Sequence, residues 1–133
     1  MIPDIRYPIT DIRSLYAESV GVTPGFADFC VEQLEGCGAI TAKRMFGGVG
    51  IYSGDVFFAL IDNDILYLKV DDSTRPEFQR AGGEPFRPFG DDRDKMQYYS
   101  VPVSVLEDAD ALCAWGRKAI AVAIAAKGRK KRR

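Results

Sequence analysis

The stretch TAKRMFGGVGIY, residues 41–52, combines two cations, Lys43 and Arg44, with a run of glycines, a pattern that can bind phosphate. A dinucleotide loop needs G-x-G-x-x-G between a strand and a helix, and a Walker loop needs Gly-Lys-Ser/Thr after its last glycine. Here the spacing is G-G-x-G, and Ile51 and Tyr52 follow. The pattern therefore favours a tight bend or bulge between two strands. The expected bend comprises Met45, Phe46, Gly47, Gly48 and Gly50.

Lys43 and Arg44 are the cations of this stretch, and as neighbours on a strand they should point to opposite faces of a sheet. We expect one to be exposed and the other to be partly covered or paired with an acid. Met45 and Phe46 are most simply core residues, with an apolar patch for a partner as the alternative. Lys43 and Arg44 are thus candidate contacts for a partner or for nucleic acid.

Side chains suited to acid–base, nucleophilic or metal chemistry are scarce. The sequence has no histidine, which excludes Ser-His-Asp and Cys-His catalysis and histidine-containing zinc sites. The acids cluster at expected turns and helix starts, where aspartate is favoured for local reasons, and no cluster has calcium-loop spacing. These clusters are Asp62/Asp64, Asp71/Asp72 and Asp91/Asp92/Asp94. The sequence therefore predicts no catalytic residue, no cofactor and no metal site.

The three cysteines, Cys30, Cys37 and Cys113, form no CxxC pair. An odd count in a chain with no sign of secretion predicts free thiols. Cys30 and Cys37 lie seven positions apart, so they would share one face of a helix. Small buried apolar residues explain them better than a redox pair or a metal site.

Charge is divided unevenly along the 133 residues, although the net charge is only −1. Residues 127–133 hold six of the eighteen cations, which leaves twelve cations against nineteen acids, a net charge of −7, in residues 1–126. A basic tail can bind nucleic acid, or it can be a solvated end without structure. Six phosphate contacts would give a salt slope of about −5, so any DNA binding should be weak and independent of sequence. The tail cations are Lys127, Arg129, Lys130, Lys131, Arg132 and Arg133.

The elements that must position these residues follow from periodicity and turn signals. Thr23-Pro24 predicts a helix start, and Gly36 and Gly38 predict its end. Connections as short as Ser53-Gly54-Asp55 and Asp62-Asn63-Asp64 allow only antiparallel neighbours. The segment 56–61 is continuously apolar, as in a central strand. The expected strands of this meander are residues 40–46, 49–53, 56–61 and 65–70.

The second half of the chain should add a short helix, a hairpin and the longest helix. The short helix starts at Arg75-Pro76 and runs to about residue 81, and the hairpin pairs 85–89 with 96–101. Ser104 and Glu107 have the spacing of a capping box, which predicts a helix over 105–127. This order of helices and strands predicts an α+β fold, with one antiparallel sheet and helices mainly on one face.

We expect residues 1–22 to be an N-terminal extension, 23–126 to be one domain, and 127–133 to be the basic tail. No apolar run approaches the roughly 20 residues of a membrane span, and the N-terminus lacks the pattern of a signal peptide. The sequence therefore predicts a cytoplasmic protein without membrane association.

Several ordered blocks stand out along the sequence: RMFGGVGIY at 44–52, VFFALIDNDILYLKVDD at 56–72, Phe78, GGEPF at 82–86, YYSVP at 98–102 and LEDADALCAW at 106–115. These blocks resemble the TfoX N-terminal domain family. The resemblance covers about residues 26–126 and implies an α+β domain of the secretion-chaperone-like type. It also implies a role in regulating competence for DNA uptake in bacteria, and it implies no catalytic residue.

These observations lead us to expect a non-enzymatic regulatory or adaptor domain that acts through protein contacts, in transcription. Its protein partner is of unknown identity, and a homodimer is an open alternative. One alternative function is weak direct nucleic-acid binding through the tail together with Lys43 and Arg44. Another is a small-molecule or enzymatic site on the sheet, against which the missing histidine weighs.

Overall fold

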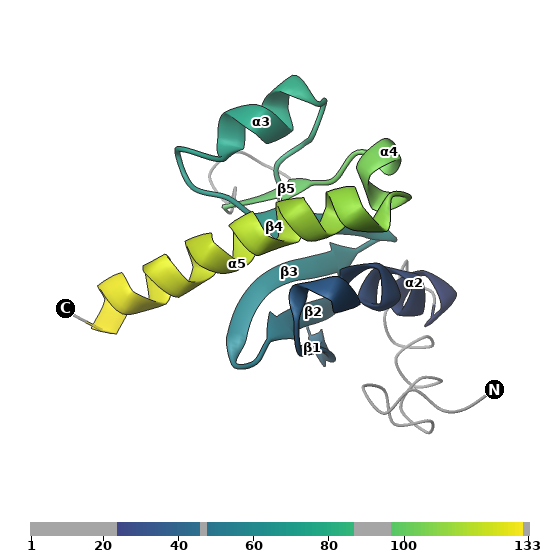
Figure 1. Ribbon diagram of the computed structural model, residues 1–133, viewed down its shortest axis with the longest axis horizontal. Helices are drawn as coiled ribbons and strands as arrows, with labels where there is room; N and C mark the ends of the chain where they lie inside the picture. Colours follow the sequence, from purple (N-terminus) through teal and green to yellow (C-terminus); the bar gives the residue numbers. More distant parts are fainter. Residues whose placement is uncertain (1–23, 46–47, 87–96, 132–133) are drawn as a thin grey trace.

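The computed structural model describes residues 24–45, 48–86 and 97–131, with the side chains of 24, 45 and 129–131 left out. These residues form one antiparallel sheet in the order β1-β2-β3-β4-β5, and helices lie against it (Figure 1). The predicted α+β class is therefore confirmed. The elements are α2 (Pro24–Leu34), the 3-10 turn η1 (Glu35–Cys37), β1 (Ile40–Met45), β2 (Gly48–Ser53), β3 (Val56–Asp62), β4 (Ile65–Lys69), α3 (Arg75–Arg80), β5 (Tyr98–Ser100), α4 (Val103–Leu106) and α5 (Ala109–Lys131).

Two predicted turns close the hairpins of the meander. Gly54 joins β2 to β3 with a φ of 60°, a conformation that glycine adopts without steric cost. Asn63 and Asp64 join β3 to β4 with φ values of 54° and 56°, as in the two-residue turns that suit the twist of paired strands. β3 is the central strand, as its apolar sequence predicts.

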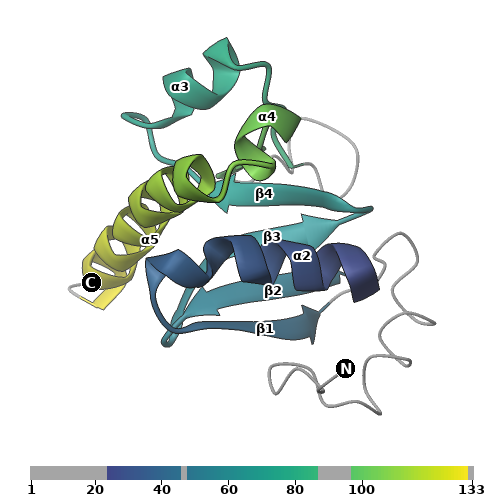
Figure 2. The ribbon, with the colours of Figure 1, turned by 45° about the vertical axis from the view of Figure 1, so that its right-hand side comes forward.

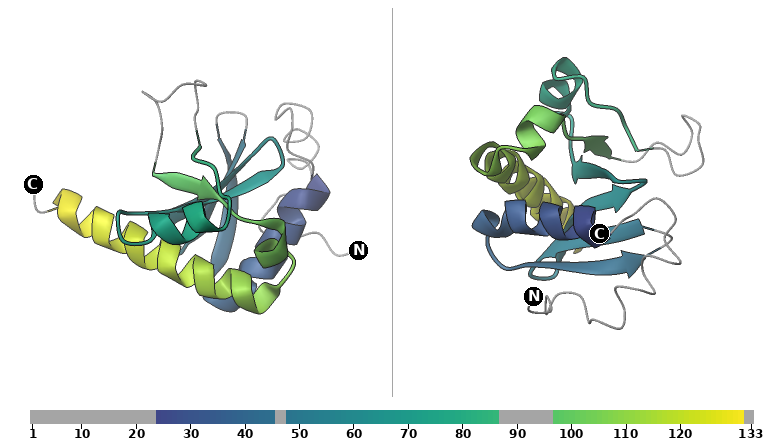
Figure 3. Two further views of the ribbon diagram at one scale, coloured as in Figure 1. Left: turned by 90° about the horizontal axis from the view of Figure 1, so that it is seen from above. Right: turned by 90° about the vertical axis from the view of Figure 1, so that its right-hand side faces the viewer.

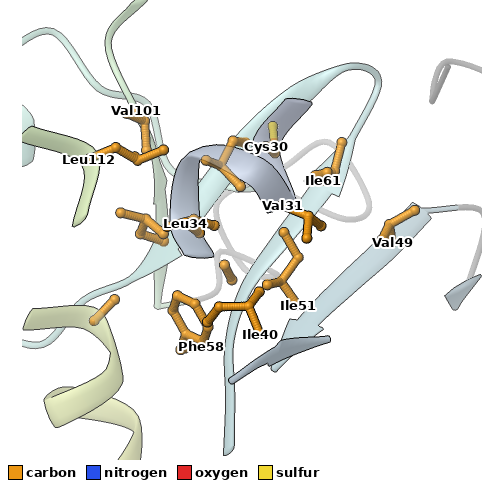
Figure 4. Packing of buried hydrophobic residues seen from close by; sticks show 14 of the residues in the cluster. Cys30, Val31, Leu34, Ile40, Val49, Ile51, Phe58, Ile61, Val101 and Leu112 are labelled. Atoms are coloured by element: carbon orange, nitrogen blue, oxygen red, sulfur yellow. The ribbon is translucent and has the colours of Figure 1, made fainter. Parts of the chain in front are cut away.

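The core fills the space between the sheet and two helices, α2 and α5, which lie over the same face (Figure 2, Figure 3). Cys30, Val31 and Leu34 of α2 point at the sheet, and none of them is exposed (Figure 4). Fully burying a side chain such as Leu34 or Phe58 stabilises the fold by about 1.5–3 kcal/mol. One apolar face per helix thus holds the two layers together.

The predicted helix over 105–127 is divided, and the predicted capping box is wrong. Pro102 is the N-cap of the short α4, so Ser104 lies inside that helix and caps nothing. Asp108 follows α4, and its Oδ1 accepts a hydrogen bond from the Ala111 N–H at 3.1 Å in the first turn of α5. Asp108 is therefore the side chain that caps α5, which continues to Lys131, past the predicted end.

Only part of the predicted hairpin of 85–89 with 96–101 falls within the described residues. Pro85 forms a single bridge to Tyr99, supported by hydrogen bonds of 2.9 Å from Phe86 N–H to the Tyr98 carbonyl and from Ser100 N–H to the Glu84 carbonyl. Residues 87–96 lie outside the described part. Pro85 therefore sits beside β5 at the sheet edge, where its missing N–H is tolerated.

The glycine bend is a hairpin between β1 and β2, closed by the pair Met45 and Gly48. Phe46 and Gly47 lie outside the described residues. Gly48 has neither a positive φ nor a bulge, because the irregularity in the β2–β3 register falls between Ile51 and Tyr52; the prediction that Gly47 or Gly48 has one of these features therefore stays a prediction, which now concerns Gly47. Glycine is required at position 48 because the neighbouring strand approaches closely: a Cβ there would lie 2.5 Å from the Ile61 carbonyl oxygen.

Candidate functional site

The sheet has two different faces, and cross-strand register assigns the residues to them. Residues directly opposite on paired strands share a face. Ala42, Ile51, Ala59, Leu68 and Tyr99 stand opposite one another across all five strands and are all buried beneath the helices. The alternate residues face away, and no helix of the described part lies over them (Figure 3). This open face carries Thr41, Lys43, Gly50, Tyr52, Phe57, Leu60, Tyr67, Lys69, Tyr98 and Ser100.

Five of these residues, one from each strand, form a continuous chain of contacts that we call the lysine–aromatic row. The Lys43 Nζ lies 5.1 Å from the centre of the Tyr52 ring. The ring centres of Tyr52 and Phe57 are 5.3 Å apart, and those of Phe57 and Tyr98 are 5.6 Å apart. The Lys69 Nζ lies 4.9 Å from the centre of the Tyr98 ring. Three rings are thus bracketed by two cations, in the geometry of cation–π contacts.

A bulge in β3 explains why Phe57 belongs to this row. Ile51 pairs with Ala59, whereas the next residue, Tyr52, pairs with Phe57, so that Phe58 is the extra residue. A bulge allows two successive residues to turn toward the same side, and both Phe58 and Ala59 are fully buried. The bulge therefore places Phe58 in the core while keeping Phe57 beside Tyr52.

The phenols of this face are held in their neutral form. Burial raises the pKa of Tyr98 to about 12, with a smaller contribution from Tyr52. Burial also raises the pKa of Tyr67, together with the negative charges of Asp62 and Glu84. The Tyr67 ring packs on Phe86 at 5.1 Å between centres. A neutral phenol at physiological pH offers a hydrogen bond and an apolar ring, which suits binding better than proton transfer.

The row ends in a groove beside the C-terminal half of α5, which runs past the sheet (Figure 1). One hollow of about 330 Å³ is lined by Phe57, Lys69, Tyr98 and Lys127, among others. A second hollow, of about 240 Å³, shares Lys69 with it. The Lys127 Nζ donates to the Asp55 carboxylate at 2.7 Å and so ties α5 to the β2–β3 turn. The row and the groove therefore form one connected surface.

The two cations of the opening stretch have different places in this arrangement. Lys43 is exposed and belongs to the row, whereas Arg44 stands opposite Val49, on the strand side that faces the helices, and is also exposed. Both side chains are exposed, so neither cation is covered; the alternative, that one of the pair is paired with an acid, stays a prediction. Lys43 and Arg44 do lie on opposite faces of the sheet, but Arg44 is too near the end of β1 to be buried.

The tail cations are only partly within the described structure. The backbone of α5 is helical through Lys131, so Lys127, Arg129, Lys130 and Lys131 continue a helix. The side chains beyond Gly128 and the whole of Arg132 and Arg133 lie outside the description. Lys127 reaches the groove that also contains Lys69, and this connects the start of the tail to the row.

Sequence patterns alone do not predict the site residues Tyr52, Phe57, Lys69 and Tyr98. A signal for one of them, Lys69, was present, because Tyr67 and Lys69 alternate with Leu66 and Leu68, which indicates a strand with two different faces. What periodicity lacks is the identity of the cross-strand neighbours. The meeting of one residue from each of five strands depends on register, which only the folded sheet supplies.

The acid clusters have local roles where the structure describes them. One oxygen of Asp71 accepts hydrogen bonds from Ser73 N–H at 2.9 Å, Ser73 Oγ at 2.7 Å and Thr74 N–H at 3.1 Å, and these bonds lower the pKa of Asp71. Asp64 belongs to the β3–β4 turn. Asp91, Asp92 and Asp94 lie outside the described residues. Within the described ranges, no three His, Cys, Asp or Glu side chains gather as metal ligands.

The lengths of the helices and the family of the chain bear on what this domain does. None of the helices in the described ranges has both the length and the apolarity needed to cross a membrane. A search among curated proteins found no match. A family model, that of the TfoX N-terminal domain, matches residues 32–123, a span that runs from α2 through the whole sheet into α5 and contains the complete row. This is a regulatory domain family, and the match identifies a competence-regulator-like domain. The chain belongs to the TfoX N-terminal domain family.

Proposed function

We propose that this chain is a non-enzymatic adaptor domain in transcriptional regulation, and that it binds a partner protein through the lysine–aromatic row. The observation that carries the proposal is the row itself. It exposes parts of Tyr52 and Phe57 between two lysines on a sheet face that no described helix covers. Aromatic residues are enriched at the centres of protein interfaces, and cations at the rim add orientation and speed of association.

The partner segment should be acidic and should carry apolar side chains. Lys43 and Lys69 bracket the rings, so a segment that crosses the row would place acids at its ends and apolar groups over Tyr52 and Phe57. Taken as a whole, residues 1–126, which include the row, do not favour an acidic partner, because they carry a net charge of −7. Within residues 1–126 the row therefore offers a local attraction for an acidic partner on a chain that is acidic on balance.

The regulatory role also has support from the chemistry of the described site. The phenols of Tyr67 and Tyr98 are neutral at physiological pH, and burial raises the pKa of each further. The sequence contains no histidine that could serve as a general base. The family is a regulatory one. A domain with these properties acts by holding a partner, and we place that action in the control of competence genes.

The test begins with co-purification of partners from the native host and continues with the purified partner. The double variant Lys43→Glu/Lys69→Glu should reduce affinity for that partner by at least tenfold in calorimetric titration. The matched control is Lys118→Glu, which reverses another exposed lysine on α5, paired with Glu77 at 3.0 Å. Undiminished affinity in the double variant would reject the row as the binding surface, and so would an equal loss in the control.

A second candidate function, weak nucleic-acid binding by the tail, is favoured by the helix that continues through Lys131. Lys127 is engaged with Asp55. The other five cations of the tail could make at most five phosphate contacts, which give a salt slope of about −4.5. Fluorescence anisotropy over a salt series compares the full chain with a chain ending at Gly128. We expect binding that is lost in the truncated chain and near physiological salt. Tight, sequence-selective binding by the truncated chain would instead favour Lys43 and Arg44 as DNA contacts.

A further inference from the structure

The structure brings together two cysteines that are far apart in sequence, Cys37 of η1 and Cys113 of α5. All three cysteines of the chain are free thiols. The helical spacing of Cys30 and Cys37 had suggested that those two share a face, but α2 ends at Leu34 and Cys37 belongs to the tighter turn that follows. Cys30 lies apart from this site, in the core between α2 and the sheet (Figure 4).

Glycines on both sides make room for the two sulfur atoms in a reciprocal way. A Cβ at Gly36 would lie 2.9 Å from the Cys113 Sγ, and a Cβ at Gly116 would lie 3.0 Å from the Cys37 Sγ. Contacts this short between a Cβ and a sulfur would force one of them to move. Each thiol therefore occupies space that a missing side chain on the opposite element leaves open, and η1 and α5 approach closely at this point.

Hydrogen bonds hold both thiols at this contact. The Cys37 thiol donates to the Cys113 carbonyl at 3.5 Å, and the Cys113 thiol donates to the Gln33 carbonyl at 3.4 Å. The Arg117 guanidinium donates to the Gly36 carbonyl at 3.2 Å, which places a positive charge next to the pair. Cys37 is half-buried and Cys113 is buried. Solvent thus reaches one thiol of the pair and not the other.

From this geometry we infer that Cys37 and Cys113 form a dithiol modification site, which a low-molecular-weight disulfide converts into an intramolecular disulfide between η1 and α5. The Cys37 thiolate attacks one sulfur of the small disulfide and releases one thiolate, which takes a proton. Cys113 then loses its proton and attacks the Cys37 sulfur, which releases the second small thiol. The protein gives up two protons and two electrons, and the small disulfide is reduced to two thiols.

The surroundings set a slow rate for this exchange. Burial raises the pKa of the Cys37 thiol to about 12, a hydrogen bond and the charge of Cys113 add to the effect, and Arg117 opposes it. Because the thiolate is the attacking species, the rate should rise with pH throughout the range from 7 to 9. Once formed, the bond closes a loop of 76 residues, which restricts the unfolded chain. The oxidised form should therefore melt at a temperature higher by about 5 °C or more.

The test treats the full reduced chain with excess oxidised glutathione and follows it by mass spectrometry and peptide mapping. We expect a loss of two hydrogen atoms, a peptide that links Cys37 to Cys113, and full reversal by a phosphine reductant. Cys30→Ala should leave this cross-link in place, whereas Cys37→Ser should abolish it. The same treatment of the chain unfolded in urea, which exposes all three thiols, gives the distribution of cross-links expected without the folded structure.

Two results would overturn the inference. One is a stable glutathione adduct on Cys37 of the folded chain without the internal link. The other is a yield of the Cys37–Cys113 link in the folded chain no higher than in urea. Cys113→Ala separates the two steps, because it should trap glutathione on Cys37 as a stable mixed disulfide. If Cys113→Ala takes up no glutathione while the parent chain forms the link, Cys37 is not the attacking thiol.

Discussion

The helix-covered face and the open face of the sheet are built from the same strands but are occupied differently. Across the covered face, Ile51, Ala59 and Leu68 are completely removed from solvent. Across the open face, Leu60 and Tyr98 are also buried, but Tyr52, Phe57 and Tyr67 are only half-buried. Lysines lie over the rings of Tyr52 and Tyr98. The apolar content of a strand therefore does not decide its role; what covers each face does.

Phe57 and Phe58 show this difference most directly, because they are consecutive residues of one strand. The bulge in β3 sends Phe58 into the core, where it is fully buried, and leaves Phe57 between Tyr52 and Tyr98. Replacing a fully buried residue leaves a cavity, whereas replacing a half-buried one mainly opens the surface. The covered face should thus carry stability, and the open face should carry recognition.

The largest expected effect is the contrast between the two phenylalanines. Phe58→Ala should lower the free energy of unfolding by about 3–5 kcal/mol, because it creates a cavity beneath α5. Phe57→Ala should cost about 1 kcal/mol, the scale of an aromatic pair at a partly exposed site. Urea denaturation with linear extrapolation gives both values. Equal losses would show that the open face is as much a part of the core as the covered face.

The next effect concerns the sheet between the two faces. Gly48→Ala should lower the free energy of unfolding by more than about 1 kcal/mol, because its Cβ would lie 2.5 Å from the Ile61 carbonyl oxygen, a backbone atom that cannot turn aside. Gly25→Ala is the matched control, since a Cβ there meets nothing within 4 Å and alanine favours a helix. Thermal melting compares the two, and a stable Gly48→Ala would mean that β2 and β3 can separate without cost.

A third effect distinguishes the two faces by alkaline titration. Burial raises the pKa of Cys30, on the covered face, from 9.0 to about 12, and that of Tyr98, on the open face, from 10.0 to about 12. The unfolded chain releases these protons first, so the stabilising contribution is complete below the unfolded pKa and is lost as pH rises toward 12. The slope is at most about 1.4 kcal/mol per pH unit for each group.

Urea unfolding at a series of pH values separates the two contributions. Cys30→Ala should reduce the component that starts near pH 9, to which Cys37 also contributes. Tyr98→Phe should reduce the one that starts near pH 10, to which Tyr67 also contributes. The row would be shown to be well hydrated if Tyr98→Phe left the pH profile unchanged.

The smallest expected effect on stability is at the lysines of the row. Lys43→Ala and Lys69→Ala each remove a cation–π contact on the protein surface, worth about 0.5–1 kcal/mol. Lys118→Ala is the comparison, because it removes one exposed ion pair with Glu77 of similar or smaller worth. Thermal melting of all three should show shifts of a few degrees at most. A large loss at Lys43 or Lys69 would make these residues structural and would weaken the case for recognition.

Local signals in the sequence determined much of the architecture of this protein. Three kinds of feature depend only on residues a few positions apart and can therefore be predicted from the sequence. They are the helix start at Thr23-Pro24, the turns at Gly54 and Asn63, and the apolar run of β3. The α+β class, the central position of β3 and the family resemblance follow from these signals. The absence of histidine likewise restricted the chemistry without any knowledge of the fold.

Only the tertiary structure decided how distant residues meet. Asp108 rather than Ser104 caps α5 because the geometry of the chain after Pro102 begins a separate short helix. The β2–β3 pair has a bulge beside Ile51 and Tyr52, since the register of a strand is set by its partner. The row takes one residue from each strand, and Cys37 meets Cys113 across 76 positions. Such meetings are set by strand register and helix packing, which depend on the burial of the whole core and not on the spacing of neighbours along the chain.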